Sequence, residues 1–137
     1  MLRPEVIRRR LQKLDEYLAI LEKLRSYTLE EFLADPERYG SAERFLQLAI
    51  EALMDMGSHV IAELDLGTIE AYSDIPKILA QKGYISPELA DRWVRMIGMR
   101  NILVHDYLDI DRKLVHSALK DHLQDIAMLR KSFAQFL

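Results

Sequence analysis

Apolar residues recur at spacings of three and four along most of the chain, which is the period of an amphipathic α-helix rather than of a β-strand. Near the N-terminus the apolar stripe consists of Ile7, Leu11, Leu14, Leu18 and Leu21. Residues 41–64 carry apolar side chains on two sides, so we expect a long helix that is buried on two faces. A last helix is expected after Asp109 or Asp111, and its inward stripe consists of Val115, Leu119, Ile126, Leu129 and Phe133.

Local signals mark the beginnings of two further segments. Thr28 and Glu31 have the spacing of a capping box, in which the side chain of each residue accepts a hydrogen bond from the backbone N–H of the other. They are expected to open a short helix. Asp35 and Pro36 supply an N-cap and a first-turn proline for the segment that follows.

The helical pattern breaks once more in the second half of the chain. Residues 74–76 interrupt it, and a short helix near residues 77–82 is expected to end at Gly83. Ser86 is a strong helix start, because a proline and a glutamate follow this N-cap residue. The helix that it opens is expected to run to about His105.

We therefore predict an all-α fold, an up-and-down bundle of four main helices with short additional helices, in a single domain over residues 1–137. A chain of 137 residues can bury one sizeable core but is too short for two domains. Five glycines and four prolines are few for an all-β chain, which needs a turn about every 8–12 residues.

The composition of the chain excludes several classes of protein and site. The absence of cysteine excludes disulfides, thiol nucleophiles and thiolate metal sites. A net charge of −3 excludes a generally basic nucleic-acid binder but leaves room for a local basic site. No run approaches the roughly 18–20 consecutive apolar residues of a membrane span, and the N-terminus has no apolar signal region. We expect a cytoplasmic protein with no membrane partner.

Four polar side chains break the pattern of the helix that ends near His105. When residues 89–108 are wound at about 100° per residue, charged side chains fall on one arc and apolar side chains on the opposite arc. Arg100 and Tyr107, seven residues apart, lie in the middle of the apolar arc and are nearly superimposed. Asn101 and His105 lie together at its edge.

Arginine does not lose its charge in a protein, so burying it unpaired costs several kcal/mol and requires an explanation. One hypothesis is structural: Arg100 pairs with a core carboxylate such as Asp55 or Glu51, while Asn101 and His105 bond to backbone carbonyls. The other is functional: the helix lines a polar cleft in which arginine binds an anion and histidine moves a proton. The helical pattern alone favours neither.

Residues 100–107 read R-N-I-L-V-H-D-Y. This segment resembles the motif of the HEPN superfamily, and specifically of its HepT-like toxin branch: Arg, four residues, His, one residue, Tyr. Residues 43–55 read E-R-x-x-Q-x-A-I-E-A-x-x-D, with His59 beyond them, and are similar to the second long helix of that family. The resemblance covers nearly the whole chain, and the motif positions show no departure from it.

The resemblance implies a metal-independent endoribonuclease with no cofactor, in which Arg100 and His105 form the catalytic pair and Asn101 supports them. An imidazole can act as base or acid near neutral pH, and a guanidinium can stabilise the charge that develops on a phosphorane. Family members are homodimers that bring both motifs to one cleft. This implies a composite site with two histidines and two arginines, acting on an RNA substrate such as tRNA or mRNA.

Tyr107 has a separate role implied by the resemblance. In this branch the toxin is paired with a minimal nucleotidyltransferase antitoxin that transfers AMP from ATP to the motif tyrosine, as in type VII-like toxin–antitoxin pairs. The structural alternative is that Tyr107 is a core or interface tyrosine with a bonded hydroxyl. A second function also stays open: a non-catalytic HEPN module that binds a nucleotide or serves as the partner subunit of a nucleotidyltransferase.

The other histidines are expected to be structural. His122 lies on the inward stripe of the last helix as a satisfied core residue, and it does not share a face with His116 that would hold a metal. Asp55 and His59 are four residues apart, but a pair without a third ligand is a weak indication of a metal site.

A basic stretch lies close to the N-terminus, at residues 8–10 and Lys13. The simpler interpretation is a solvated helix face. The alternative is that these side chains contact RNA outside the cleft.

Overall fold

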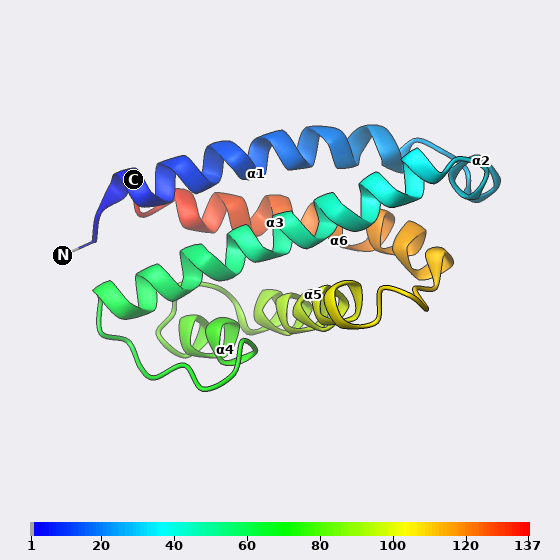
Figure 1. The fold of residues 1–137 in the computed structure, drawn as a ribbon. Coiled ribbons are helices and arrows are strands. Elements are labelled where there is room, and N and C mark those ends of the chain that lie inside the picture. The colour runs from blue at the N-terminus through cyan, green and yellow to red at the C-terminus, as the bar shows by residue number, and fades with distance from the viewer. Residues whose placement is uncertain (1) are drawn as a thin grey trace.

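Four long helices run alternately up and down, and two short helices are inserted between them (Figure 1). The computed structural model describes residues 2–137, in which no β-strand occurs. The helices are α1 (Pro4–Arg25), α2 (Leu29–Leu33), α3 (Pro36–Glu63), α4 (Asp74–Gln81), α5 (Pro87–His105) and α6 (Arg112–Ala134). The predicted all-α, up-and-down bundle of four main helices with short additional ones is confirmed.

The predicted capping signals operate as expected. In α2 the Glu31 backbone N–H donates to Thr28 Oγ1 at 3.2 Å, and the Thr28 N–H donates to Glu31 Oε1 at 2.9 Å. At the start of α5 the hydroxyl of Ser86 accepts from the Leu89 N–H at 3.1 Å. The predicted end of α5 at His105 is also correct.

The second long helix starts at Pro36, as the predicted N-cap and first-turn proline indicated, and so begins before the apolar pattern that runs from about residue 41. Asp35 caps it by accepting from the Glu37 N–H at 2.9 Å. The short helix near residues 77–82 starts at Asp74 instead. Its proline, Pro76, lies in the first turn, where a missing N–H removes no helical hydrogen bond.

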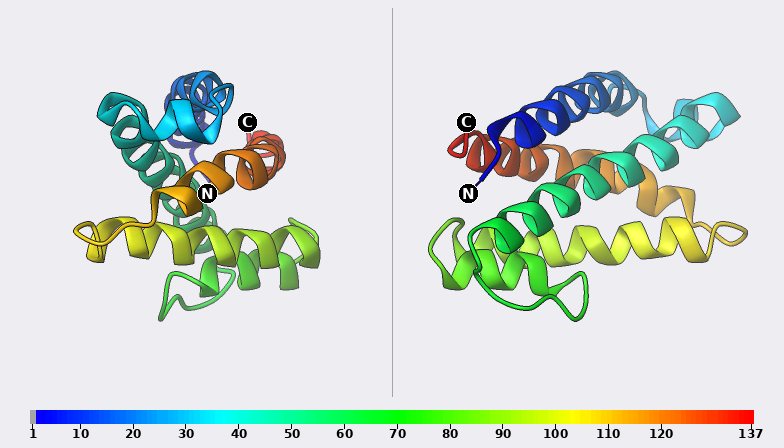
Figure 2. Two further views of the ribbon diagram at one scale, coloured as in Figure 1. Left: turned by 90° about the vertical axis from the view of Figure 1, so that its right-hand side faces the viewer. Right: turned by 60° about the vertical axis from the view of Figure 1, so that its left-hand side comes forward.

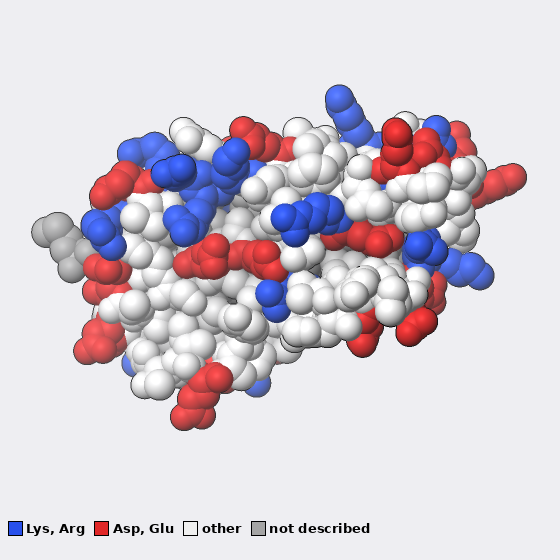
Figure 3. All heavy atoms as spheres, in the orientation of Figure 1, with Lys and Arg blue, Asp and Glu red and all other residues white. Residues whose placement is uncertain are grey.

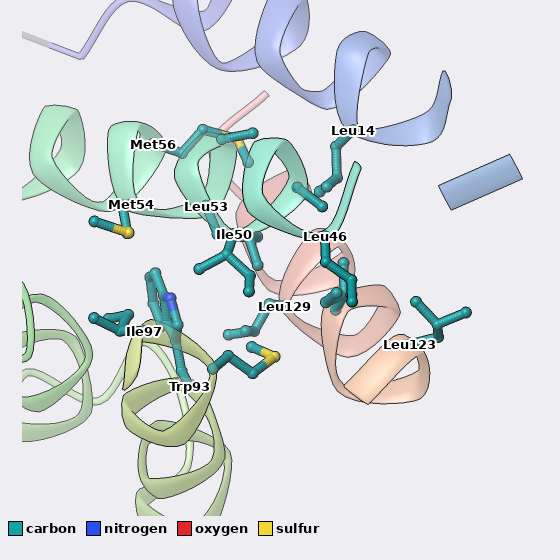
Figure 4. Packing of buried hydrophobic residues seen from close by; sticks show 14 of the residues in the cluster. Leu14, Leu46, Ile50, Leu53, Met54, Met56, Trp93, Ile97, Leu123 and Leu129 are labelled. Atoms are coloured by element: carbon teal, nitrogen blue, oxygen red, sulfur yellow. The ribbon is translucent and has the colours of Figure 1, made fainter. Parts of the chain in front are cut away.

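The core is built around α3, which is buried on two faces as expected. Trp93 of α5 lies close to this helix, with Ile97 beside it (Figure 4), and its ring packs edge-on against Phe133 of α6 at 5.8 Å between centroids. At Gly57 of α3 a Cβ atom would collide with Ile75 of α4 and would lie 3.1 Å from the Trp93 ring. A glycine is therefore needed where α3, α4 and α5 meet.

By length and composition alone, α3 could cross a membrane, and it is the one such helix among the described residues. Half of its apolar window is buried inside the protein. Burial on two faces explains this apolar composition, because the core helix of a globular protein passes the same test.

The arrangement of the helices determines where the motif residues lie. Both chain termini are at one end of the bundle, and the connection between α5 and α6 is at the other end (Figure 1). This connection, residues 106–111, projects outward from the helices in both views of Figure 2. The C-terminal end of α5, which carries most of the motif, is therefore at an exposed end of the molecule.

Candidate functional site

Arg100 connects α5 to α3 through an ion pair. Its Nε donates to Glu51 Oε2 at 2.9 Å, and its Nη1 donates to Asn101 Oδ1 at 3.1 Å. The side chain of Arg100 is 15% exposed and that of Glu51 is 29% exposed. The hypothesis that Arg100 pairs with a core carboxylate is therefore correct for Glu51. That hypothesis had assumed that Asn101 bonds a backbone carbonyl, but among the described residues Asn101 instead accepts a bond from Arg100.

The pairing with Glu51 does not seal the guanidinium from solvent. Arg100 lines an open pocket of about 250 Å³, whose other walls are Glu51, Met54, Asp55, Ser58 and Tyr72. A guanidinium has five N–H donors, and within the described part of the chain Arg100 uses two of them. The remaining donors are available to an anion that enters the pocket.

Asp55 is a second carboxylate, beside Glu51, in the wall of this pocket. Burial raises the pKa of the Asp55 carboxyl above its ordinary value, the Arg10 cation opposes that rise, and the Glu51 charge adds to it. Its closest cation is Arg10, with 3.8 Å between Arg10 Nε and Asp55 Oδ2. The Arg10 cation partly offsets the charge of Asp55 at the edge of the pocket.

His105 is the last residue of α5 and is exposed. Asn101 lies one turn before it on the same helix face. Arg100 and His105 are five residues apart, so they leave the helix about 140° apart around its axis and about 7.5 Å apart along it. Among the described residues of a single chain, Arg100 hydrogen-bonds Asn101 and not His105.

The expected superposition of Tyr107 on Arg100 is wrong. The N–H of Asp106 closes the last turn of α5 on the Ile102 carbonyl at 2.9 Å, and the helix ends there. Tyr107 lies in the following turn and is 67% exposed, and Leu108, predicted on the apolar arc, is 83% exposed. The helical projection failed because it continued a helix past its end. A core position for Tyr107 is also excluded.

Tyr72 is a site residue that the sequence pattern did not indicate. It lies in the connection between α3 and α4, is 51% exposed, and its ring centroid is 5.3 Å from the Arg100 guanidinium carbon. This is the distance of a cation–π contact. An aromatic residue in a turn-rich segment carries no periodic signal, so only the folded chain places it here.

A larger cavity of about 700 Å³ adjoins the Arg100 pocket. It lies between the 69–73 segment and one face of α5, and its walls are Ile69, Glu70, Ala71, Tyr72, Ser73, Val94, Ile97, Gly98 and Asn101. Tyr72 lines both hollows. Tyr72 is therefore a wall shared between the cavity and the Arg100 pocket.

The basic stretch of α1 borders a groove of about 390 Å³ on the other side of the Arg100 pocket. Its walls are Arg9, Arg10, Lys13, Tyr17, Leu48, Glu51, Ala52 and Asp55. Figure 3 shows the blue spheres of this basic cluster over the first half of α1, beside a red acidic band on α3. Glu51 and Asp55 line both the groove and the Arg100 pocket, so the two are adjacent.

The remaining histidines differ in their environments. His116 is buried, and its Nε2 is 3.0 Å from the Tyr27 carbonyl oxygen, as a structural histidine requires. His122 was predicted to be satisfied, but its buried Nδ1 has no hydrogen-bond partner among the described residues. Burial lowers the pKa of His122, partly opposed by nearby aspartates. No group of three or more acidic or histidine side chains among residues 2–137 is placed to hold a metal ion.

The chain is similar in sequence to known ribonucleases. The family described as "Ribonuclease HepT-like" matches residues 14–132. A "tRNA nuclease HepT" from Aphanizomenon flos-aquae is 31% identical over 136 residues, covering 98% of this chain and 91% of that protein. An "mRNA nuclease HepT" from Shewanella oneidensis is 35% identical over 80 residues, covering 58% of this chain and 60% of that protein.

The fold is similar to solved structures of toxins bound to antitoxins. The tri-AMPylated HEPN toxin of Shewanella oneidensis in complex with MNT antitoxin has a TM-score of 0.86 and 25% identity, over 95% of this chain and 97% of that chain. The cytosolic protein YutE from Bacillus subtilis, of unknown function, has a TM-score of 0.87 at 22% identity over 99% and 91% of the two chains, which supports the fold alone. The family match and the fold of the HEPN toxin agree with the resemblance to HepT-like toxins.

Proposed function

Because this chain belongs to the HepT-like ribonuclease family, we propose that it is a cytoplasmic endoribonuclease toxin that cleaves RNA without a metal ion and is silenced by a nucleotidyltransferase antitoxin. The relatives named as nucleases and the toxin–antitoxin complexes of the same fold support this proposal. The observation that carries it is the Arg100 guanidinium, held in place but open to an anion on one side.

The proposed chemistry uses three residues of α5. His105 takes the proton of a ribose 2′-hydroxyl or returns one to the leaving 5′-oxygen, since imidazole titrates near neutral pH. The free N–H donors of Arg100 bind the phosphate and stabilise the added negative charge of the phosphorane. Asn101, fixed by its bond from Arg100 and one turn before His105, positions either the imidazole or a phosphate oxygen.

Two copies of the chain are proposed to complete the site. Arg100 and His105 of one chain leave α5 about 140° apart, so they face different sides of the helix. A second copy placed over the exposed end of α5 would bring its own histidine to this arginine. Ile102 and Leu108 flank His105 and are 41% and 83% exposed, which supports coverage of this region by another protein surface.

Tyr107 is the proposed acceptor of AMP. Its hydroxyl has no partner within the described residues, and the ring is 67% exposed on a projecting loop. In the transfer, the tyrosine oxygen attacks the α-phosphorus of ATP, pyrophosphate leaves and the phenolic proton is lost. The adduct adds a bulky anion two residues from His105, where it would repel and exclude RNA phosphate.

The test is to incubate the purified protein with total RNA and with tRNA in the presence of EDTA, beside His105→Ala and Arg100→Ala. Cleavage by the unmodified protein alone is expected, with unchanged helical circular dichroism in both variants. Full cleavage by either folded variant would overturn the assignment. Intact mass is recorded on each sample, because an added AMP would account for inactivity.

The non-catalytic alternative has one observation in its favour. The ion pair between Arg100 and Glu51 gives the arginine a structural role that needs no RNA. In that case Arg100→Ala would lower stability, and the unmodified, dimeric protein would bind a nucleotide or a nucleotidyltransferase without cutting RNA.

A further inference from the structure

We propose that the cavity between the 69–73 segment and α5 is a nucleobase subsite, which accepts the base of the nucleotide adjoining the phosphate held at Arg100. This inference rests on the proposed function and specifies how the site would hold its RNA. Metal-free cleavage needs the scissile phosphate to be fixed relative to two side chains, and a stacked base is a common means of fixing single-stranded RNA.

The size and walls of the cavity suit a flat, largely apolar ring. Its volume of about 700 Å³ is within the range of small-molecule sites, roughly 300–1,000 Å³. Val94 and Ile97 of α5 and Ile69 of the opposite segment supply apolar walls. Gly98 lies on the same helix face, and a Cβ atom added there would meet nothing within 4 Å. The cavity therefore has free space above Gly98.

Tyr72 links the cavity to the phosphate-binding pocket. The residue lines both hollows and contacts the Arg100 guanidinium at 5.3 Å. Aromatic side chains are the surfaces on which proteins stack unpaired RNA bases. A nucleotide has its base and its phosphate joined by one ribose, so a base in the cavity beside Tyr72 is consistent with a phosphate at Arg100.

Asn101 provides the polar contact that such a subsite needs. Its side chain lines the cavity, and its Oδ1 accepts from Arg100 Nη1 at 3.1 Å. This bond identifies the oxygen side of the amide and leaves the two N–H donors of Nδ2 without a partner among the described residues. These donors match the carbonyl oxygens and ring nitrogens at the edge of a base.

The wall opposite α5 is pre-organised. The Asp74 carboxylate accepts from the backbone N–H groups of Glu70 and Ala71 at 3.0 Å each, and these bonds lower its pKa. The Tyr72 carbonyl in turn accepts from the Ile75 N–H at 3.1 Å. The segment that carries Tyr72 is thus fastened to the first turn of α4, so binding a base would require little reordering.

Gly98→Leu tests the inference by filling the cavity, and Gly40→Leu is its matched control. Both glycines lie in helices, and an added Cβ would meet nothing within 4 Å at either. The two substitutions therefore raise helix propensity equally. Gly40 lines none of the three hollows around Arg100.

Binding is measured by calorimetry on the full-length His105→Ala protein, so that the result does not depend on whether the protein cleaves RNA. The probes are the four nucleoside 5′-monophosphates, with ribose 5-phosphate and inorganic phosphate as base-free controls. We expect the nucleotides to bind about 5- to 100-fold more tightly than ribose 5-phosphate. Gly98→Leu should remove that difference and leave ribose 5-phosphate binding unchanged, whereas Gly40→Leu should preserve both.

Each contrary outcome has a distinct meaning. Equal binding of nucleotides and ribose 5-phosphate would overturn the subsite, whether or not the unmodified protein cuts RNA. A change of oligomeric state on Gly98→Leu, measured by light scattering, would show instead that a second copy of the chain covers the cavity and would also overturn it. Nucleotide binding that Gly98→Leu abolishes, in a protein that never cuts RNA, would support the subsite and contradict the proposed nuclease function.

Discussion

Arg100 and Glu51 form an ion pair across the contact between α5 and α3, with Arg100 Nε 2.9 Å from Glu51 Oε2. The pair lies at the wall of an open pocket, so the same bond that stabilises the packing of two helices also holds the guanidinium in position. A catalytic arginine must be fixed before the substrate arrives, because electrostatic stabilisation depends on pre-organised charge. If Arg100 is catalytic, as proposed, Glu51 acts as its positioning residue.

Removing each partner of this pair should have different effects on activity. Glu51→Gln keeps an acceptor for Arg100 and is expected to lower the free energy of unfolding by about 1 kcal/mol or less, with cleavage retained within about 10-fold. Arg100→Gln should cost a similar free energy of unfolding and lower the cleavage rate at least 100-fold, or about 2.7 kcal/mol of transition-state stabilisation. Urea unfolding and single-turnover cleavage measure the two effects.

A second ion pair, between Arg130 and Asp15, offers the control. Arg130 Nε and Nη2 donate to the two carboxylate oxygens of Asp15 at 2.9 and 3.0 Å, and the pair lies outside the Arg100 pocket. Arg130→Gln should alter stability alone. Equal losses of cleavage in Arg130→Gln and Arg100→Gln would mean that Arg100 acts only through stability.

Tyr107→Phe should abolish AMP transfer to this chain. The protein is incubated with ATP and a minimal nucleotidyltransferase of the antitoxin type, and the intact mass is measured. Tyr72→Phe is the matched control, because Tyr72 is the half-exposed tyrosine next to Arg100. An added AMP is expected in the unmodified chain and in Tyr72→Phe. An AMP-sized mass increase that persists in Tyr107→Phe would identify another acceptor.

The beginnings of α2 and α5 were predictable because they depend on neighbours in sequence. The capping box of Thr28 with Glu31 and the N-cap at Ser86 each involve residues three apart, and the structure contains both. The end of α5 was predicted at the correct residue, yet no glycine or proline follows His105 to mark it firmly. The projection was therefore continued to Tyr107, which lies outside the helix.

The contacts of the site depend on pairs that are distant in sequence. Glu51 and Asp55 are one helical turn apart on α3, and the pattern gave no reason to prefer either as the partner of Arg100. The packing of α3 against α5 places Glu51 within hydrogen-bond distance of Arg100. Tyr72 approaches Arg100 because Asp74 fastens the preceding segment to the start of α4, which no periodic pattern reveals.

Removing positive charge from α1 should weaken RNA binding. Arg9 and Lys13 line the groove adjacent to the Arg100 pocket, and a basic groove of this kind follows an RNA backbone. For Arg9→Ala with Lys13→Ala, we expect a several-fold rise in KM at 0.1 M salt. The salt dependence of binding should also become shallower, by about 0.7 for each RNA phosphate that the variant no longer neutralises.

The control for this prediction is Lys23→Ala with Arg25→Ala, which removes the same charge from the other end of α1. These variants should bind RNA nearly as well as the unmodified protein. If both double variants have the same KM, the basic stretch is a solvated helix face and only the overall charge matters.

Acidification should destabilise the protein through His122. Burial lowers the pKa of His122 below its ordinary value of about 6.5, an effect to which Arg95 adds and which Asp125 and Asp121 oppose. Below pH 6.5 the unfolded chain therefore takes up a proton that the folded chain resists, so the free energy of unfolding falls as the pH falls. His122→Leu should reduce the drop in melting temperature between pH 7.5 and 5.5.

His105→Ala removes an exposed histidine and serves as the control for this experiment. It should leave the pH dependence of the melting temperature unchanged. A drop in melting temperature that is as large in His122→Leu as in the unmodified protein would show that another group causes it.

Arg100 of one chain is proposed to act with His105 of another, and mixing two inactive variants tests this pairing. Arg100→Ala and His105→Ala proteins are unfolded together, refolded as a mixture, and assayed for RNA cleavage. In the shared cleft of a symmetric dimer, each mixed pair keeps intact one of the two Arg100–His105 pairs that form between the chains. About half of the dimers are mixed, and each mixed dimer keeps one of its two Arg100–His105 pairs. Recovery of about a quarter of the activity of the unmodified protein is therefore expected. A mixture as inactive as either variant, with mixed dimers present by native mass spectrometry, would contradict it.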